Sequence, residues 1–228
     1  MSIKEFTKEL NGNGRVEGEL IKAIFYSLLV SFVLLSILYF FKLRDIPDFI
    51  PKYGFFIFFA ILSYAIILSS IRQVRAYQNF ACMSGMMVGM TTGMIAGFLP
   101  GFFVGSTNGM FWGSIVGMGI GISIGAWNGK CCGIMGVMEG LMAGFMGGIM
   151  GAMTAVMMLN DNLKVAGVIL FLISAVIVFS LNFMVYKEMK EREREKKEDY
   201  TTILFLSIVL TSLTIWFMVF GPRSALFG

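Results

Sequence analysis

The stretch Met83–Gly101 reads MSGMMVGMTTGMIAGFLPG, with glycine at every fourth position and methionine in many of the places between. This four-residue spacing starts at Gly85 and continues without a break as far as Gly133. Small residues at positions i and i+4 let two membrane helices bring their backbones into contact, which drives helix association in hydrocarbon. The stretch is therefore expected to form helices that pack closely on one another.

The composition is that of an integral membrane protein. Of the 228 residues, 57% are hydrophobic, and they gather in continuous runs of about 20 residues, the length of a membrane span. Such runs, without alternation of polar and apolar residues, predict helices rather than barrel strands. We expect an all-α fold that forms one membrane domain over residues 1–228.

Seven apolar runs have the length of a membrane span. They are Ile21–Phe41, Tyr53–Ile71, Phe80–Leu99, Phe102–Trp127, Gly133–Leu159, Leu163–Tyr186 and Thr201–Phe220. The boundary at Pro100–Gly101 is the least marked, because the glycine series crosses it. One helix over the whole series would be about 70 Å long, more than twice the thickness of the hydrocarbon layer, so the chain must fold back.

The basic residues predict the orientation of the bundle. With a cytoplasmic N-terminus, thirteen of the 18 lysines and arginines lie inside the cell and five lie outside, as the positive-inside rule favours. Residues 1–20 then form a polar cytoplasmic segment, which we expect to be retained because no cleavage site of small residues follows the first apolar run. Residues 187–199 form a charged cytoplasmic helical linker, and the acids interleaved among its bases argue against nucleic-acid binding.

The glycines define the predicted packing surface of a central Gly/Met-rich core, residues 80–159, which the other four spans are expected to shield from lipid. Each interior glycine lowers helix stability by on the order of 1 kcal/mol relative to alanine, so backbone contact must compensate. A four-residue step exceeds the 3.6-residue turn, so the stripe rotates around the helix and one straight partner cannot cover it. We expect either right-handed GxxxG-type crossings or two neighbours for each helix, in a bundle or in a ring of subunits. The predicted packing residues are Gly85, Gly89, Gly93, Gly97, Gly105, Gly109, Gly113, Gly117, Gly121, Gly125, Gly136, Gly140, Gly144 and Gly148.

Methionines form a stripe on one face of the fifth span. Their steps of three and four residues from Met135 to Met157 average close to 3.6, so the thioethers follow one face across the membrane. Methionine also fills irregular space beside glycine, and packing alone explains such a stripe equally well. Cysteine stands at the start of both methionine-rich helices, however, and soft thiolate and thioether ligands suit Cu(I) or Ag(I). The candidate metal ligands are Cys82, Met83, Met86, Met90, Met94, Cys131, Cys132, Met135, Met138, Met142, Met146 and Met150.

Two polar residues are candidates for an ion or proton pathway. Glu139 is the single carboxylate inside a predicted span and borders the methionine stripe. It is a candidate proton carrier or cation ligand, with a structural hydrogen bond as the alternative. Asn108 is expected in the middle of the fourth span, where it either lines a pathway or forms a hydrogen bond with another helix. The pair Cys131–Cys132 also has a plain interpretation, as two small apolar residues at the start of a helix.

These features predict a transport or channel protein of the cell membrane, in which Cu(I) moves along methionine ladders loaded by cytoplasmic cysteines. One alternative is a structural or assembly subunit, held by a glycine zipper in a homo-oligomer or a larger membrane complex; another is a channel for a different ion. An enzyme is not expected, because the chain has no histidine and its glycines lack the phosphate-loop pattern. The expected partners are the lipid bilayer and other membrane subunits, not nucleic acid.

Overall fold

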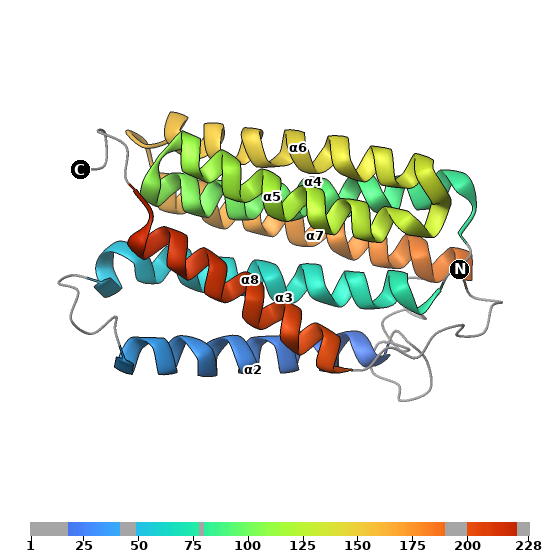
Figure 1. The fold of residues 1–228 in the computed structure, drawn as a ribbon, viewed down its shortest axis with the longest axis horizontal. Helices are drawn as coiled ribbons and strands as arrows, with labels where there is room; N and C mark the ends of the chain where they lie inside the picture. The colour runs from blue at the N-terminus through green and yellow to red at the C-terminus, as the bar shows by residue number, and fades with distance from the viewer. Residues whose placement is uncertain (1–17, 42–48, 78–79, 190–199, 223–228) are drawn as a thin grey trace.

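Seven long apolar helices make up the described part of the chain (Figure 1). The structure is a computed structural model, and it describes residues 18–41, 49–77, 80–189 and 200–222. The helices are α2 (Gly18–Phe41), α3 (Phe55–Ala76), α4 (Cys82–Asn108), α5 (Met110–Gly129), α6 (Gly133–Met157), α7 (Leu163–Met189) and α8 (Tyr200–Phe220). The prediction of an all-helical fold is confirmed for the described residues, and all seven helices are long and apolar enough to cross the hydrocarbon layer, as a multi-pass membrane protein requires.

Two short turns complete the described elements. A π-helical turn, η2 (Ile50–Gly54), leads into α3, and a 3-10 turn, η3 (Lys130–Cys132), joins α5 to α6. Most of the predicted N-terminal segment 1–20 and of the predicted linker 187–199 lies outside the described residues. The side of the membrane on which those two segments lie stays a prediction.

The turn between the third and fourth spans lies at Gly109, so the predicted boundary at Pro100–Gly101 is wrong. Helix α4 continues through Pro100 and ends where Gly109 adopts a φ of 102° and a ψ of 172°. Proline removes one hydrogen bond from a helix, but packed neighbours make it tolerable in a membrane helix. The backbone angles of Gly109 belong to a region that glycine alone occupies readily. Consequently Asn108 is the last residue of α4 and not a mid-span residue.

The helices are stacked in layers, with α6 at one edge of the bundle and α2 at the opposite edge (Figure 1). Helix α3 lies in the interior, where it contacts α2, α4, α7 and α8. Helices α4, α5 and α6 pack mainly on one another. The Gly/Met-rich three-helix unit therefore occupies one side of the molecule, which corrects the prediction that the other four helices shield it from lipid.

The apolar core is centred on α3 and the middle of α4. Tyr64 of α3 and Phe102 and Phe103 of α4 are among the largest side chains that are fully buried. Polar contacts join the outer helices: the Ser207 hydroxyl of α8 hydrogen-bonds with those of Ser27 and Ser31 on α2, at 3.1 and 2.8 Å. Hydrogen bonds of this kind between membrane helices are worth about 0.6–2 kcal/mol each.

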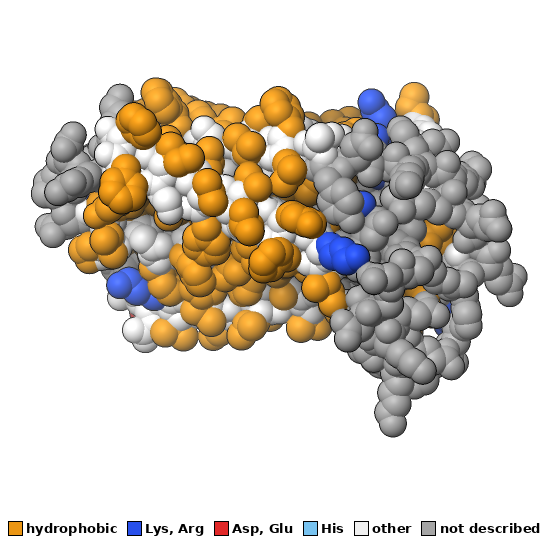
Figure 2. All heavy atoms as spheres, turned by 90° about the horizontal axis from the view of Figure 1, so that it is seen from below, with side chains coloured by type: hydrophobic (Ala, Val, Ile, Leu, Met, Phe, Trp, Pro, Cys, Tyr) orange, Lys and Arg blue, Asp and Glu red, His pale blue; other side chains and the backbone are white. Residues whose placement is uncertain are grey.

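The outer surface has the pattern of a protein embedded in lipid. Figure 2 shows one face, on which apolar side chains cover the middle of the molecule and Lys and Arg side chains lie toward its ends. Apolar side chains in contact with hydrocarbon and charged ones near its borders are what a bilayer requires. This pattern agrees with contact between the helices and a lipid bilayer.

Candidate functional site

The contacts among α4, α5 and α6 are made by backbone atoms. A Cβ atom placed on Gly97 would lie 2.7 Å from the carbonyl oxygen of Gly144. One placed on Gly121 would lie 2.7 Å from the Cα of Gly97 and 2.9 Å from the Gly144 oxygen. These distances are far below ordinary van der Waals contact, so even alanine does not fit unless a helix moves. The three glycines therefore meet in a single layer across the three-helix unit.

Five such layers are stacked along the unit. They are Gly89/Gly129/Gly136, Gly93/Gly125/Gly140, Gly97/Gly121/Gly144, Gly101/Gly117/Gly148 and Gly105/Gly113/Ala152. Because successive members on one helix are four residues apart, the layers follow one another at about 6 Å. The order of the partners shows that α4 and α6 run parallel and that α5 runs antiparallel to both. Each glycine-rich helix thus meets the other two within a single chain.

Some glycines differ from the predicted packing set. Gly109 forms the turn after α4 instead of a helix contact. Gly147 and Gly151 were not predicted, yet the backbone at these positions lies against the backbones of Met94 and Phe98 on α4. The sequence contained a signal for them: Gly147 and Gly151 are four residues apart, and they form a second glycine series that is offset by one residue from Gly144 and Gly148. Two adjacent glycine stripes let α6 approach α4 along a broad surface.

The methionine stripe of α6 lies on the helix face opposite to its glycines. The five predicted ligands on this helix, from Met135 to Met150, are 50–61% exposed, and Met153 and Met157 continue the exposed stripe. On α4, Met83, Met90 and Met94 are exposed and Met86 is half-buried. Because the glycine face points into the three-helix unit, the α6 thioethers point away from it. We call the exposed methionines of α6, from Met135 to Met157, the methionine face.

The exposed side chains of the other helices differ from those of the methionine face. The large exposed hydrophobic residues described on α2, α7 and α8 are isoleucine, valine, leucine, phenylalanine, tyrosine and tryptophan, without a methionine among them. Methionine is the commonest large exposed residue on α4 and α6. One chain therefore presents two chemically distinct surfaces at membrane depth.

Glu139 lies on the methionine face. It is half-buried, and its position between Met135 and Met142 places it on the same side of α6. Within the described part of the chain its carboxylate takes part in no hydrogen bond or ion pair. A carboxylate in this setting is a candidate ligand for a cation.

Asn108 joins two helices. Its Nδ2 donates a hydrogen bond to the carbonyl oxygen of Phe217 on α8, at 2.6 Å, and its side chain is buried. The contact is of the interhelical kind, one of the two roles predicted for this residue. It fixes the end of α4 against α8 and lies on a different helix from the methionine face.

The three cysteines belong to two segments that contact each other. Cys82 is the first residue of α4, and Cys131 and Cys132 belong to η3, which packs against α4. The Cys131 side chain is half-buried, and the side chains of Cys82 and Cys132 lie outside the described ones. The fold thus brings the predicted soft ligands to the same end of the three-helix unit at the level of the backbone.

Glu188 of α7 docks on the start of α4. Its Oε1 accepts a hydrogen bond from the backbone N–H of Ala81, at 3.1 Å, and one from the hydroxyl of Ser84, at 2.6 Å. A carboxylate at a helix N-terminus satisfies a backbone donor and interacts favourably with the helix dipole. This contact was not predicted, because Glu188 belongs to the segment expected to form the charged linker, whereas α7 continues to Met189.

Replacement of the Glu188 carboxylate tests this contact. We expect Glu188→Gln to lower the free energy of unfolding by about 1 kcal/mol, the usual loss when a charge-assisted helix cap is weakened. Thermal unfolding in detergent measures the change, with Lys187→Gln, an exposed neighbour on the same helix, as the control. Equal stabilities of the two variants would show that the cap contributes nothing.

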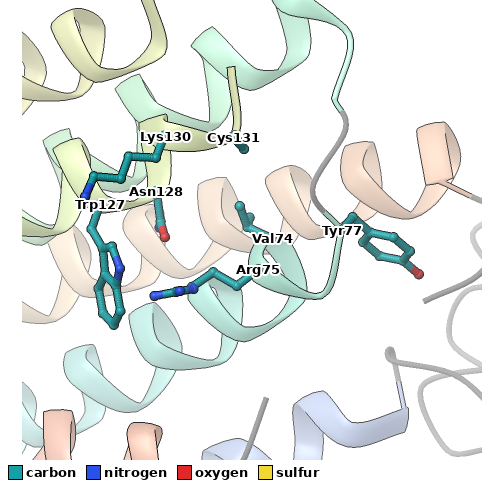
Figure 3. A pocket seen from close by; sticks show the side chains of 7 residues that line it. All are labelled: Val74, Arg75, Tyr77, Trp127, Asn128, Lys130 and Cys131. Atoms are coloured by element: carbon teal, nitrogen blue, oxygen red, sulfur yellow. The ribbon is translucent and has the colours of Figure 1, made fainter. Parts of the chain in front are cut away.

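A polar cavity of about 240 Å³ lies at the same end of the molecule, between the end of α3 and the α5–η3 junction (Figure 3). Its lining residues are Val74, Arg75, Tyr77, Trp127, Asn128, Lys130 and Cys131. The guanidinium carbon of Arg75 lies 4.2 Å from the ring centroid of Trp127, a cation–π contact. Of these residues only Cys131 is a candidate ligand on sequence grounds, because the cavity joins segments that are distant in the chain.

Comparisons with family models, curated proteins and solved structures give no match for this chain. The fold and the exposed surfaces are those expected of a multi-pass α-helical membrane protein.

Proposed function

We propose that this chain is a membrane transport protein for a soft monovalent cation such as Cu(I). In this proposal the ion is captured by the cysteines at one end of the three-helix unit. It then moves along the methionine face of α6. Weak thioether coordination allows an ion to pass from one site to the next, whereas the thiolates bind it more strongly at the entrance or exit.

The contrast between the two exposed surfaces carries this proposal. Contact with hydrocarbon requires apolar side chains on every exposed helix face. On α2, α7 and α8 these side chains are branched and aromatic. Helix α6 presents methionine in nearly every turn instead. Since lipid contact does not require sulfur, a second selective factor is needed, and thioether ligation supplies one.

The positions of the ligands support a continuous route. Cys131 precedes Met135 by four residues, and the stripe continues to Met157 at the far end of α6. A helix of this length rises by about 37 Å and so crosses the hydrocarbon layer. Glu139 adds one carboxylate near the cysteine end of the stripe, where it is able to balance the charge of a cation.

The methionine face points away from its own chain, so a second copy is part of the proposal. Two copies related by a twofold axis would present the same face to each other and enclose the thioethers between them. The glycine layers would then act within each copy as a GxxxG-type zipper that holds α6 firmly against α4 and α5. On this view the glycines fix the ladder in place and the methionines form the contact between copies.

A second candidate function is that of an assembly subunit. It is favoured by the same exposed face, because flexible methionine side chains adapt to the irregular surface of a partner. In that case the thioethers only fill space, and the cysteines have no metal to bind.

Cu(I) binding by the purified protein tests the proposal. We expect the protein, kept reduced, to compete with a chromophoric chelator for Cu(I), and the triple variant Cys82→Ser, Cys131→Ser, Cys132→Ser to bind at least tenfold more weakly, since serine is a poor ligand for a soft ion. Vesicles that contain the protein should take up Cu(I), and those with the triple variant should do so more slowly. A wild-type protein that neither binds nor transports Cu(I) would contradict the proposal and favour the assembly subunit.

A further inference from the structure

We propose that the cavity between α3 and η3 is a binding site for a phosphate-bearing anion. Two cationic side chains line it, Arg75 from the last turn of α3 and Lys130 from η3. No carboxylate is found among the described residues that line the cavity. A volume of about 240 Å³ is several times the roughly 30 Å³ that one water molecule occupies in the liquid. A phosphate group with its bound water fits such a space.

Asn128 is the observation that points most directly to a ligand. Its side chain is only 1% exposed, yet neither Oδ1 nor Nδ2 has a hydrogen-bond partner. Figure 3 shows this amide directed toward Arg75, while the Lys130 side chain extends toward Trp127. A buried amide without a partner is unfavourable and is rare in folded proteins. A phosphate oxygen in the cavity would accept a hydrogen bond from Nδ2, and bound water would satisfy Oδ1.

The Arg75 side chain is positioned for such a ligand. The stacking of its guanidinium on the Trp127 ring orients a side chain that would otherwise sample many rotamers. Arginine is well suited to phosphate because its planar fork of N–H groups matches the phosphate oxygens. Together, Arg75, Lys130 and Asn128 supply two positive charges and one neutral donor around a common space.

The site lies at the ends of helices that are long and apolar enough to span a bilayer, the level at which headgroup phosphates are expected. The cavity is at the ends of α3 and α5, two membrane-spanning helices, and Trp127 and Tyr77 in its lining are typical of the membrane–water interface. Basic pockets between membrane helices bind anionic headgroups at this level. A phosphate in solution has the same chemistry, so the experiment below separates the two sources. Cys131 also lines this cavity, but the inference uses no cysteine ligand and no residue of the methionine face.

Ligand-induced stabilisation of the delipidated protein in detergent tests this inference. The probes are phosphatidylglycerol in mixed micelles and inorganic phosphate, with phosphatidylcholine micelles and potassium chloride of equal ionic strength as references. We expect at least one probe to raise the midpoint of thermal unfolding above its reference, because a ligand that binds only the folded state stabilises it. A shift with phosphatidylglycerol alone assigns the site to lipid headgroups; a shift with phosphate, to soluble phosphates.

Variants link the stabilisation to the cavity. We expect Asn128→Leu to weaken binding about tenfold, which corresponds to the loss of one hydrogen bond to a charged group. Its unliganded stability should be equal to or above that of the wild type, because a buried amide without a partner has been removed. Lys130→Gln should weaken binding as well, whereas Lys164→Gln, an exposed lysine at the opposite end of the bundle, should leave it unchanged. The inference is overturned if neither probe stabilises the wild type, or if Asn128→Leu and Lys130→Gln keep the full shift.

Discussion

Gly121→Ala is expected to destabilise the protein strongly, by about 3 kcal/mol or more, whereas Gly119→Ala on the same helix is expected to stabilise it slightly. A Cβ atom on Gly121 would meet the backbones of Gly97 and Gly144 at 2.7–3.0 Å. These atoms are not side-chain ends that rotate away, so α4 or α6 has to move as a whole. The expected loss exceeds the usual 1–3 kcal/mol of overpacking in a core, because the layers above and below are disturbed too.

Gly119 is the matched control for this prediction. A Cβ atom there has no neighbour within 4 Å, so alanine gains its helix propensity of up to about 1 kcal/mol without a clash. Thermal unfolding in detergent, followed by circular dichroism, measures both variants. A Gly121→Ala protein as stable as the wild type would mean that the three backbones are not in contact, and the glycine layers would have to be abandoned.

The double variant Met142→Leu, Met146→Leu on the methionine face is expected to reduce Cu(I) uptake into vesicles at least tenfold. Both side chains are exposed, and leucine has a similar volume, so stability should change by less than about 1.5 kcal/mol. Leucine provides no ligand atom. Two successive turns of α6 would then lack sulfur, and an ion would have to cross about 18 Å between Met138 and Met150 with only neighbouring chains to coordinate it.

Methionines elsewhere in the chain provide the control. Met184→Leu with Met218→Leu removes two thioethers from α7 and α8, where both are at least half-buried. This pair should leave uptake unchanged. If both double variants transport Cu(I) like the wild type, the methionine face is not the pathway. If the Met142→Leu, Met146→Leu variant also keeps the oligomeric state of the wild type, the methionines serve only to fill space by packing.

The helices themselves were predictable because hydrocarbon imposes a simple rule on length and composition. The start of α6 at Gly133 and its end near Met157 follow from an apolar run bounded by Lys130 on one side and Asp161 on the other. The methionine stripe was also predictable, because a mean spacing near 3.6 residues keeps side chains on one face of any α-helix. The contacts that the glycines on the opposite face of α6 make with α4 and α5 were known only from the structure.

Other features depended on contacts that a single sequence does not reveal. Proline at position 100 suggested a break, but neighbours in the packed unit stabilise α4 through it, and the chain turns at Gly109 instead. Glu188 looked like a member of a charged run until its hydrogen bonds to the start of α4 were known. The cavity near Asn128 forms only where the end of α3 contacts the end of α5, so no local sequence pattern predicts it.

The parallel arrangement of α4 and α6, with α5 antiparallel between them in the chain, has a consequence for how the protein is made. A ribosome delivers α4 and α5 before α6, so the glycine surface that α6 covers stays open until α6 has been synthesised. A nascent chain that ends at Gly129 would expose the glycine surface of α4 and α5, to which another helix with a row of small residues is able to bind. Correct assembly therefore requires that α6 reach this surface before a foreign helix does.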